Sequence, residues 1–115
     1  MASRADERIY RRFNVRVPLD VSSAGQLQVC ETDDVGAGGC RAVVLFPMHR
    51  GDHVRVRLRS DRVDFEASGQ AAVAWATREP PYRVGLQFSE PLVEQSGRFL
   101  QALLGPVMLR TDGTR

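Results

Sequence analysis

Apolar and polar residues alternate along much of the chain, which is the pattern of half-buried β-strands. The alternation runs over residues 15–22 and resumes at 26–30 after a Ser-Ala-Gly turn. It is clearest over residues 54–59, where two valines and a leucine alternate with three arginines. Each segment predicts a strand with one face toward a common core. Pro18 lacks an N–H, so we expect the first strand to be at an edge or irregular there.

Further strands are predicted in the middle of the chain. Residues 32–39 form a glycine-rich loop, and the apolar segment 40–46 follows it as a strand. Residues 63–77 predict a long strand that bends at Ser68-Gly69, because glycine interrupts regular strands. Alternation returns over residues 82–88 and predicts the last strand.

The period of the pattern changes near the end of the chain. Apolar residues recur at spacings of three and four between Leu92 and Leu104, which indicates one face of an α-helix. Pro91 suits the first turn of this helix, and Gly105-Pro106 suits its end. About six antiparallel strands with short connections, followed by one helix, predict a mainly β fold. We expect a meander or Greek-key-like barrel with an open end or side that the helix covers.

Length and composition fit one domain, because 115 residues can enclose a single core. The expected parts are a flexible arginine-rich arm at 1–12, the barrel and helix at 13–105, and a tail at 106–115. No segment approaches the roughly 20 apolar residues that span a bilayer, and the charged N-terminus lacks a secretory signal. We therefore expect a cytoplasmic protein that does not insert into membranes.

The positions of cysteine and histidine do not match a known metal site. The spacing of Cys30 and Cys40 fits no zinc pattern, and His49 and His53 are too few to complete one. The chain also lacks a nucleophile–base arrangement, a Walker loop and a dinucleotide-binding βαβ unit. The sequence therefore predicts a protein that is not an enzyme and that holds no metal or cofactor.

All 16 basic residues are arginine, although the net charge is only +2. The low net charge disfavours nucleic acid as a partner. Arginine, however, binds a phosphate or a guanine edge with two parallel hydrogen bonds and stacks on bases.

Two short motifs stand out against this background. The first is an RxxxR at Arg12 and Arg16, and the second is a DxGxxG that begins at Asp34. In a chain this rich in arginine, about two RxxxR pairs arise by chance, so the first motif means little alone. Its position just before a strand, about 20 residues ahead of the Asp-Gly motif, makes the combination more specific.

The order and spacing of these motifs resemble the PilZ family, whose pattern is an RxxxR followed by a [D/N]xSxxG loop. The resemblance covers residues 8–104 and includes the segments CRAVVLF, AAVAWA and YRVGLQF. It implies a β-barrel that binds the bacterial second messenger cyclic di-GMP and signals to an unidentified effector protein without catalysis.

The resemblance also implies roles for individual residues. Arg12 and Arg16 would grip the ligand, and Asp34 would accept hydrogen bonds from the N1–H and N2–H₂ edge of guanine. Gly38 and Gly39 would let backbone N–H groups approach the ligand closely and would supply positive φ angles.

Four further residues complete the implied site, and three of them also have a simpler explanation. Arg11 resembles the residue that accompanies two stacked ligand molecules in some members, and otherwise lies solvated on the arm. Trp75 would lie beside a guanine or else be a core or barrel-mouth residue, and Gly85 would leave room for it. Arg8 would contact phosphate or remain in solvent.

Position 36 departs from the family pattern, because Gly36 stands where the family usually has serine. Losing one neutral hydrogen bond costs about 0.5–1.5 kcal/mol, which would weaken binding without abolishing it. One alternative is therefore a degenerate PilZ domain that binds no nucleotide and acts as a protein-interaction module. Another is a barrel that binds single-stranded nucleic acid through Arg55, Arg57 and Arg59, which otherwise form a solvated face. The apolar helix face leaves open whether two copies of the chain pair.

Overall fold

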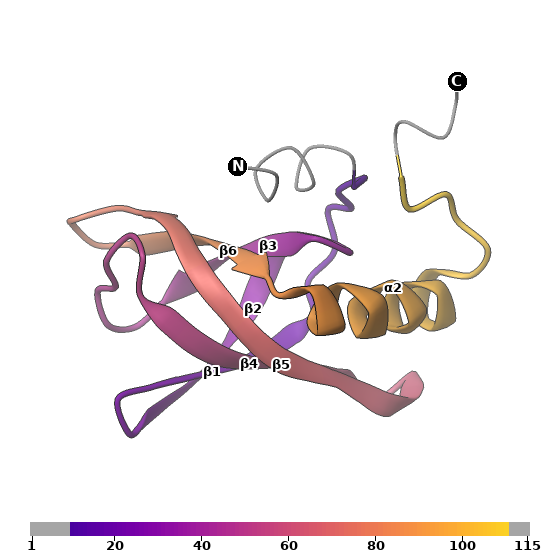
Figure 1. Ribbon diagram of the computed structural model, residues 1–115, viewed down its shortest axis with the longest axis horizontal. Helices are drawn as coiled ribbons and strands as arrows, with labels where there is room; N and C mark the ends of the chain where they lie inside the picture. The colour runs from indigo at the N-terminus through magenta and orange to yellow at the C-terminus, as the bar shows by residue number, and fades with distance from the viewer. Residues whose placement is uncertain (1–9, 111–115) are drawn as a thin grey trace.

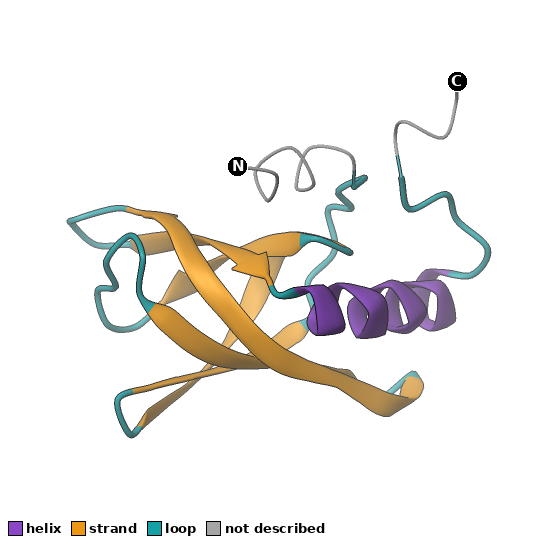
Figure 2. Ribbon diagram, in the orientation of Figure 1, coloured by secondary structure: helices purple, strands orange, loops and turns teal. Residues whose placement is uncertain are grey.

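The computed structural model describes residues 10–110, which form a six-stranded antiparallel barrel and one helix (Figures 1 and 2). The elements are β1 (Pro18–Ser23), β2 (Gln26–Gly36), β3 (Gly39–Val44), β4 (His53–Ser60), β5 (Val63–Ala76), β6 (Tyr82–Phe88) and α2 (Glu90–Leu104). Around the barrel the strands follow the order β1-β2-β3-β6-β5-β4. The predicted fold class, a mainly β barrel with a C-terminal helix, is confirmed.

The barrel closes because β1 pairs with β4 and β3 pairs with β6. Every strand therefore has two neighbours, so Pro18 does not lie at an edge, which was one of the two positions predicted for it. Pro18 is instead the first residue of β1, paired with Glu31 of β2, while pairing with β4 starts at Leu19. A proline is tolerated there because no ladder hydrogen bond to β4 needs its missing N–H.

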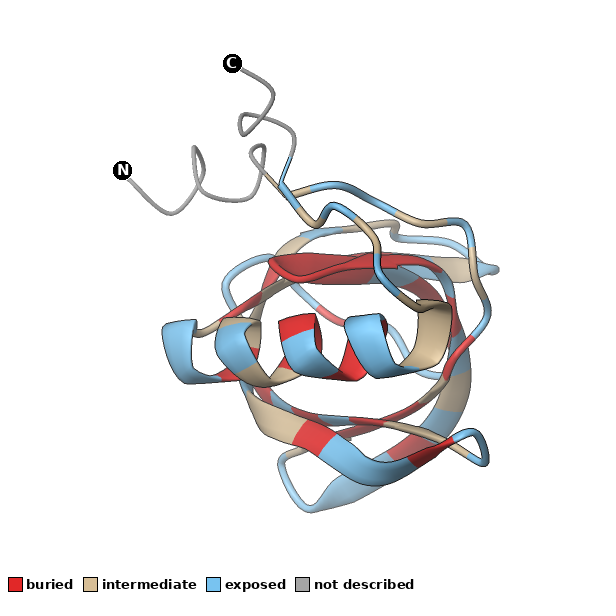
Figure 3. Cartoon of the chain, turned by 90° about the vertical axis from the view of Figure 1, so that its right-hand side faces the viewer, coloured by how far each residue is buried: buried red, intermediate tan, exposed pale blue. Residues whose placement is uncertain are grey.

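Helix α2 lies across one end of the barrel, as Figure 3 shows. Its buried face includes Leu92, Phe99 and Leu100, all fully inaccessible to solvent. Gly69 of β5 allows this close packing, since a Cβ at that position would lie 3.1 Å from the Cβ of Leu92. The helix ends at Gly105, which has a φ of 86°. No helix within residues 10–110 is long and apolar enough to cross a membrane.

The arginines of β4 do not form the simple solvated face that the sequence suggested. Arg57 donates to Asp20 of β1 at 2.6 Å from Nη2, and Arg59 donates to the same carboxylate at 3.0 Å. The hydrogen bond from Arg59 lowers the pKa of Asp20, although burial of the carboxylate opposes this shift. Two of the three arginines that a nucleic-acid site would need are therefore already paired.

Replacing Asp20 with asparagine is expected to lower the free energy of unfolding by about 1–3 kcal/mol near neutral pH. The pKa of Asp20 in the folded protein lies below its ordinary value of 3.8. Its stabilising contribution is therefore complete above that value and is lost as the pH falls through the folded-state pKa. Urea unfolding near neutral pH and again near pH ~3 measures the difference between the two proteins. An equal difference at both pH values would contradict this assignment.

Candidate ligand-binding site

The segment that carries the RxxxR motif is held against β2 by backbone hydrogen bonds. Phe13 and Val35 exchange two of them, at 2.9 and 3.0 Å. The buried hydroxyl of Thr32 donates to the carbonyl of Val15 at 2.8 Å and accepts from the N–H of Val17 at 2.9 Å. The barrel therefore fixes the path of the chain between the two arginines of the motif.

Asp34 is the centre of an arginine cluster on the outside of the barrel. Arg12 donates from Nη1 to Oδ1 at 2.9 Å, and Arg41 donates from Nε to Oδ2 at 2.6 Å. The Asp34 side chain is only 4% exposed, whereas those of Arg12 and Arg41 are 33% and 52% exposed. One buried carboxylate thus holds two guanidinium groups at the surface, and this excess of positive charge suits an anionic ligand.

A β-bulge places Asp34 on this outer face. Thr32 pairs with the inward-facing Ala42, but after a register shift Asp34 pairs with Arg41. Strict alternation from Thr32 would have turned the Asp34 side chain toward the core.

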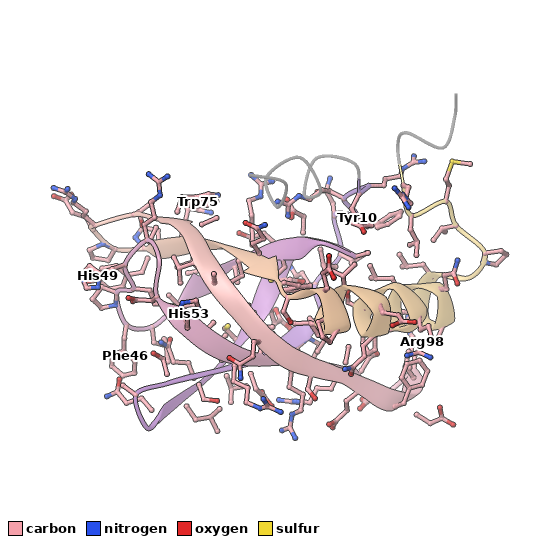
Figure 4. The ribbon with its side chains drawn as sticks, in the orientation of Figure 1. Tyr10, Phe46, His49, His53, Trp75 and Arg98 are labelled. Atoms are coloured by element: carbon pink, nitrogen blue, oxygen red, sulfur yellow. The ribbon has the colours of Figure 1, made fainter. Side chains whose placement is uncertain are left out.

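Trp75 continues the same row of paired residues across the barrel. Arg41 pairs with Gly85 of β6, and Gly85 pairs with Trp75 of β5. The indole ring lies over Gly85, where any Cβ would overlap the ring atoms. Trp75 is 40% exposed and is not a core residue (Figure 4). The predicted relation between Gly85 and Trp75 is therefore present, and the indole lies on the same outer face as Arg41.

The predicted loop at residues 32–39 is wrong over most of its length. Strand β2 continues to Gly36 and β3 starts at Gly39, so only a tight turn separates them. The expected positive φ angles at Gly38 and Gly39 are also wrong. Among residues 10–110, positive φ occurs at Ala24, Gly25, Gly51 and Gly105.

The glycines of the motif instead permit close approach of the backbone. A Cβ on Gly39 would overlap the carbonyl of Leu86 in the neighbouring strand. A Cβ on Gly36 would lie 2.5 Å from the carbonyl oxygen of Arg11. The space above Gly36 is therefore occupied by the arm.

Arg16 and Arg11 contact residues other than Asp34. Arg16 is 76% exposed and lies 3.6 Å from Glu31. The guanidinium carbon of Arg11 lies 5.9 Å from the centre of the Phe13 ring. Arg8 is outside the described residues. The structure therefore brings Arg12, but not Arg16, to Asp34.

Arg41 is the site residue that sequence reasoning missed. It is the only charged residue in the otherwise apolar segment 40–46. A tight turn between Gly36 and Gly39 places Arg41 opposite Asp34, but the expected long loop concealed this pairing.

The two thiols do not suggest redox or nucleophilic chemistry. Burial raises the pKa of Cys30 to about 11 and that of the fully buried Cys40 further still. Within residues 10–110, no cluster of three or more histidine, cysteine or acidic residues could hold a metal ion.

A family model described as PilZ domain matches residues 3–105, which is most of the chain. The chain belongs to the PilZ domain family. PilZ domains are a family of cyclic di-GMP receptors. Comparison with curated proteins found no match.

Two solved structures share the PilZ fold of this chain. The first is the Bacillus subtilis inhibitor of motility (MotI/DgrA), with a TM-score of 0.62 and 15% identity over 84% of this chain. This chain spans about half of it, 52%. The second is the PilZ domain of CeSA from a cellulose-synthesizing bacterium, with a TM-score of 0.60 and 16% identity. That match covers 81% of this chain and 95% of the CeSA domain. At these identities the likeness concerns the fold.

Proposed function

We propose that this PilZ domain binds cyclic di-GMP on the outer face formed by Arg12, Asp34, Arg41 and Trp75. Binding would change the surface presented to an effector protein in the bacterial cytoplasm. The observation that carries the proposal is the buried carboxylate of Asp34, held between two partly exposed guanidinium groups. Asp20 holds two arginines in the same way, but the Asp34 cluster also lies in one row with the exposed indole of Trp75. A ligand with two phosphates and two guanines can use both the guanidinium groups and the indole.

The chemistry of each residue matches one part of the ligand. Arginine can donate two hydrogen bonds to guanine O6 and N7 or to a phosphate. The carboxylate of Asp34 can accept from the N1–H and N2–H₂ donors, which arginine cannot. The half-exposed indole of Trp75 offers a flat surface on which a base can stack. Each carboxylate oxygen of Asp34 already accepts from an arginine, so a guanine would use the remaining lone pairs or displace one arginine.

Residues beyond this cluster complete the proposed site. Arg16 has an exposed guanidinium that can turn toward a phosphate, since its contact with Glu31 is long and solvated. Arg11 would insert between bases if two stacked ligands bind. Gly38 and Gly39 would contribute backbone close to the ligand, and Arg8 would reach a phosphate.

Isothermal titration with cyclic di-GMP tests the proposal. We expect micromolar or tighter binding, and a stoichiometry of two ligands per chain if Arg11 acts as proposed. Arg12→Ala and Arg16→Ala should each weaken binding by about tenfold or more, as expected for loss of a bidentate contact. Arg55→Ala on β4 is the matched control and should bind like the wild type. Absence of heat and of NMR shifts with the wild-type protein would refute the proposal.

Gly36 favours a second candidate, a PilZ domain that acts on a partner protein without nucleotide. The serine hydroxyl that the family would direct to the ligand is missing at this position. A partner recovered equally with and without cyclic di-GMP, together with a silent titration, would support this candidate over the first.

A further inference from the structure

The segment after the helix folds back onto the arm that carries the RxxxR motif (Figure 1). Tyr10 and Arg110 form an antiparallel bridge, and the N–H of Arg11 donates to the carbonyl of Leu109 at 2.6 Å. The guanidinium carbon of Arg110 lies 5.7 Å from the centre of the Tyr10 ring. The family match ends at residue 105, so residues 106–110 lie beyond the matched domain.

Leu109 anchors this segment to the rest of the protein. Its Cδ1 would lie 3.3 Å from a Cβ on Gly97, so it packs closely over that glycine of α2. One residue earlier in the helix, the hydroxyl of Ser96 donates to the carbonyl of Ala37 in the β2–β3 turn at 2.7 Å. Helix α2 therefore contacts both the C-terminal segment and the β2–β3 turn of the DxGxxG motif.

On the side of the arm that faces the barrel, two glycines allow close contact. A Cβ on Gly36 would come within 2.5 Å of the Arg11 carbonyl, and one on Gly38 within 2.7 Å of the Tyr10 ring. A serine at position 36 would not fit beneath the arm in this position. Gly36 is thus matched to the docked arm, which explains the departure from the family pattern without assuming a lost site.

We propose that residues 106–110 form a latch that holds the arm closed over Gly36 and keeps Arg12 on Asp34. Arg11 is fixed by Leu109 and Phe13 is fixed by Val35, so Arg12 lies between two anchored residues. The closed arm holds the guanidinium of Arg12 against Asp34 Oδ1, where a guanine N1–H or N2–H₂ donor would otherwise approach, and so keeps Arg12 from turning to the ligand. Docking of the arm and binding of cyclic di-GMP therefore compete, and the consequence for affinity rests on the function proposed above.

Two unrelated changes should open the latch. Ending the chain after Gly105 removes the contacts of residues 106–110 with the arm. Gly36→Ala places a methyl group against the Arg11 carbonyl and so displaces the arm without adding a hydroxyl. Each is expected to raise the affinity for cyclic di-GMP by about three- to tenfold, the range for releasing a closed state of modest stability. Because both act on one equilibrium, the combined variant should gain little more than either alone. Ending the chain after Arg110 keeps the latch and is the matched control.

Amide hydrogen exchange in the absence of ligand tests the latch independently. The Arg11 amide should exchange at least about fivefold faster in the 1–105 chain than in the wild type. The full-length variant Leu109→Ser should show the same increase, and it serves as a check in case the shortened chain misfolds. The proposal is wrong if the Arg11 amide exchanges at the same rate in these variants. It is also wrong if the opened variants bind cyclic di-GMP no more tightly than the wild type, or if their gains in affinity add fully in the combined variant. If the wild type binds no cyclic di-GMP, the proposed function fails, and the exchange rates alone decide whether residues 106–110 hold the arm.

Discussion

Replacing Phe99 with alanine is expected to lower the free energy of unfolding by about 3–5 kcal/mol. Phe99 is the largest fully buried side chain and projects from α2 into the end of the barrel. Its removal leaves a cavity that the surrounding strands cannot close, because hydrogen bonds around the whole barrel fix their spacing. Denaturant unfolding measures this loss, and the dependence of the free energy of unfolding on denaturant concentration should stay the same.

Phe65 provides a matched control for this substitution. Its ring meets the Phe99 ring edge to face, with centroids 6.3 Å apart, but Phe65 is 41% exposed. Phe65→Ala should therefore cost only about 1 kcal/mol, mostly the aromatic contact itself. If both substitutions cost the same, the helix does not close the barrel in the way described.

Replacing Asp34 with alanine is expected to weaken cyclic di-GMP binding by about 30- to 1000-fold, equivalent to about 2–4 kcal/mol. The change removes the acceptor that Arg12 and Arg41 share, and with it the contact that holds the two guanidinium groups side by side. It also removes the proposed acceptor for the guanine N1–H and N2–H₂ donors. Titration of the variant with cyclic di-GMP gives the loss of affinity directly.

Asp33→Ala is the control for this prediction, because Asp33 is the adjacent carboxylate in β2. It lies 3.5 Å from Arg83 and is 40% exposed, so its ion pair is largely screened by solvent. This variant should bind within about twofold of the wild type. Equal losses in both variants would indicate a shared structural effect on β2 rather than a specific role for Asp34.

The barrel itself could be predicted from the sequence. Alternation over residues 54–59 marked β4, and the change of period after residue 90 marked the helix. Gly105 marked the helix end because few other residues adopt its backbone conformation. These signals are local, and the alternation and the helical period each extend over several residues.

The finer arrangement of the site could not be predicted, because it depends on contacts between distant segments. The pairing of Arg41 with Asp34 depends on a turn shorter than the glycine content suggested. The pairing of Arg57 and Arg59 with Asp20 requires closure between β1 and β4, which no local pattern specifies. The contact of Leu109 with Arg11 joins the two ends of the chain and leaves no periodic signal.

The bulge between Thr32 and Asp34 has a consequence for how this site can evolve. The bulge holds one residue more than regular pairing with β3 needs, and Asp33 is that residue. Loss of the single codon for Asp33 would join Thr32 directly to Asp34, and regular alternation would then keep the Asp34 carboxylate on the outer face. The same one-residue deletion in a regularly paired part of β2 would instead reverse the face of the residues beyond it, so the bulge marks the place where this strand can change length without losing the site.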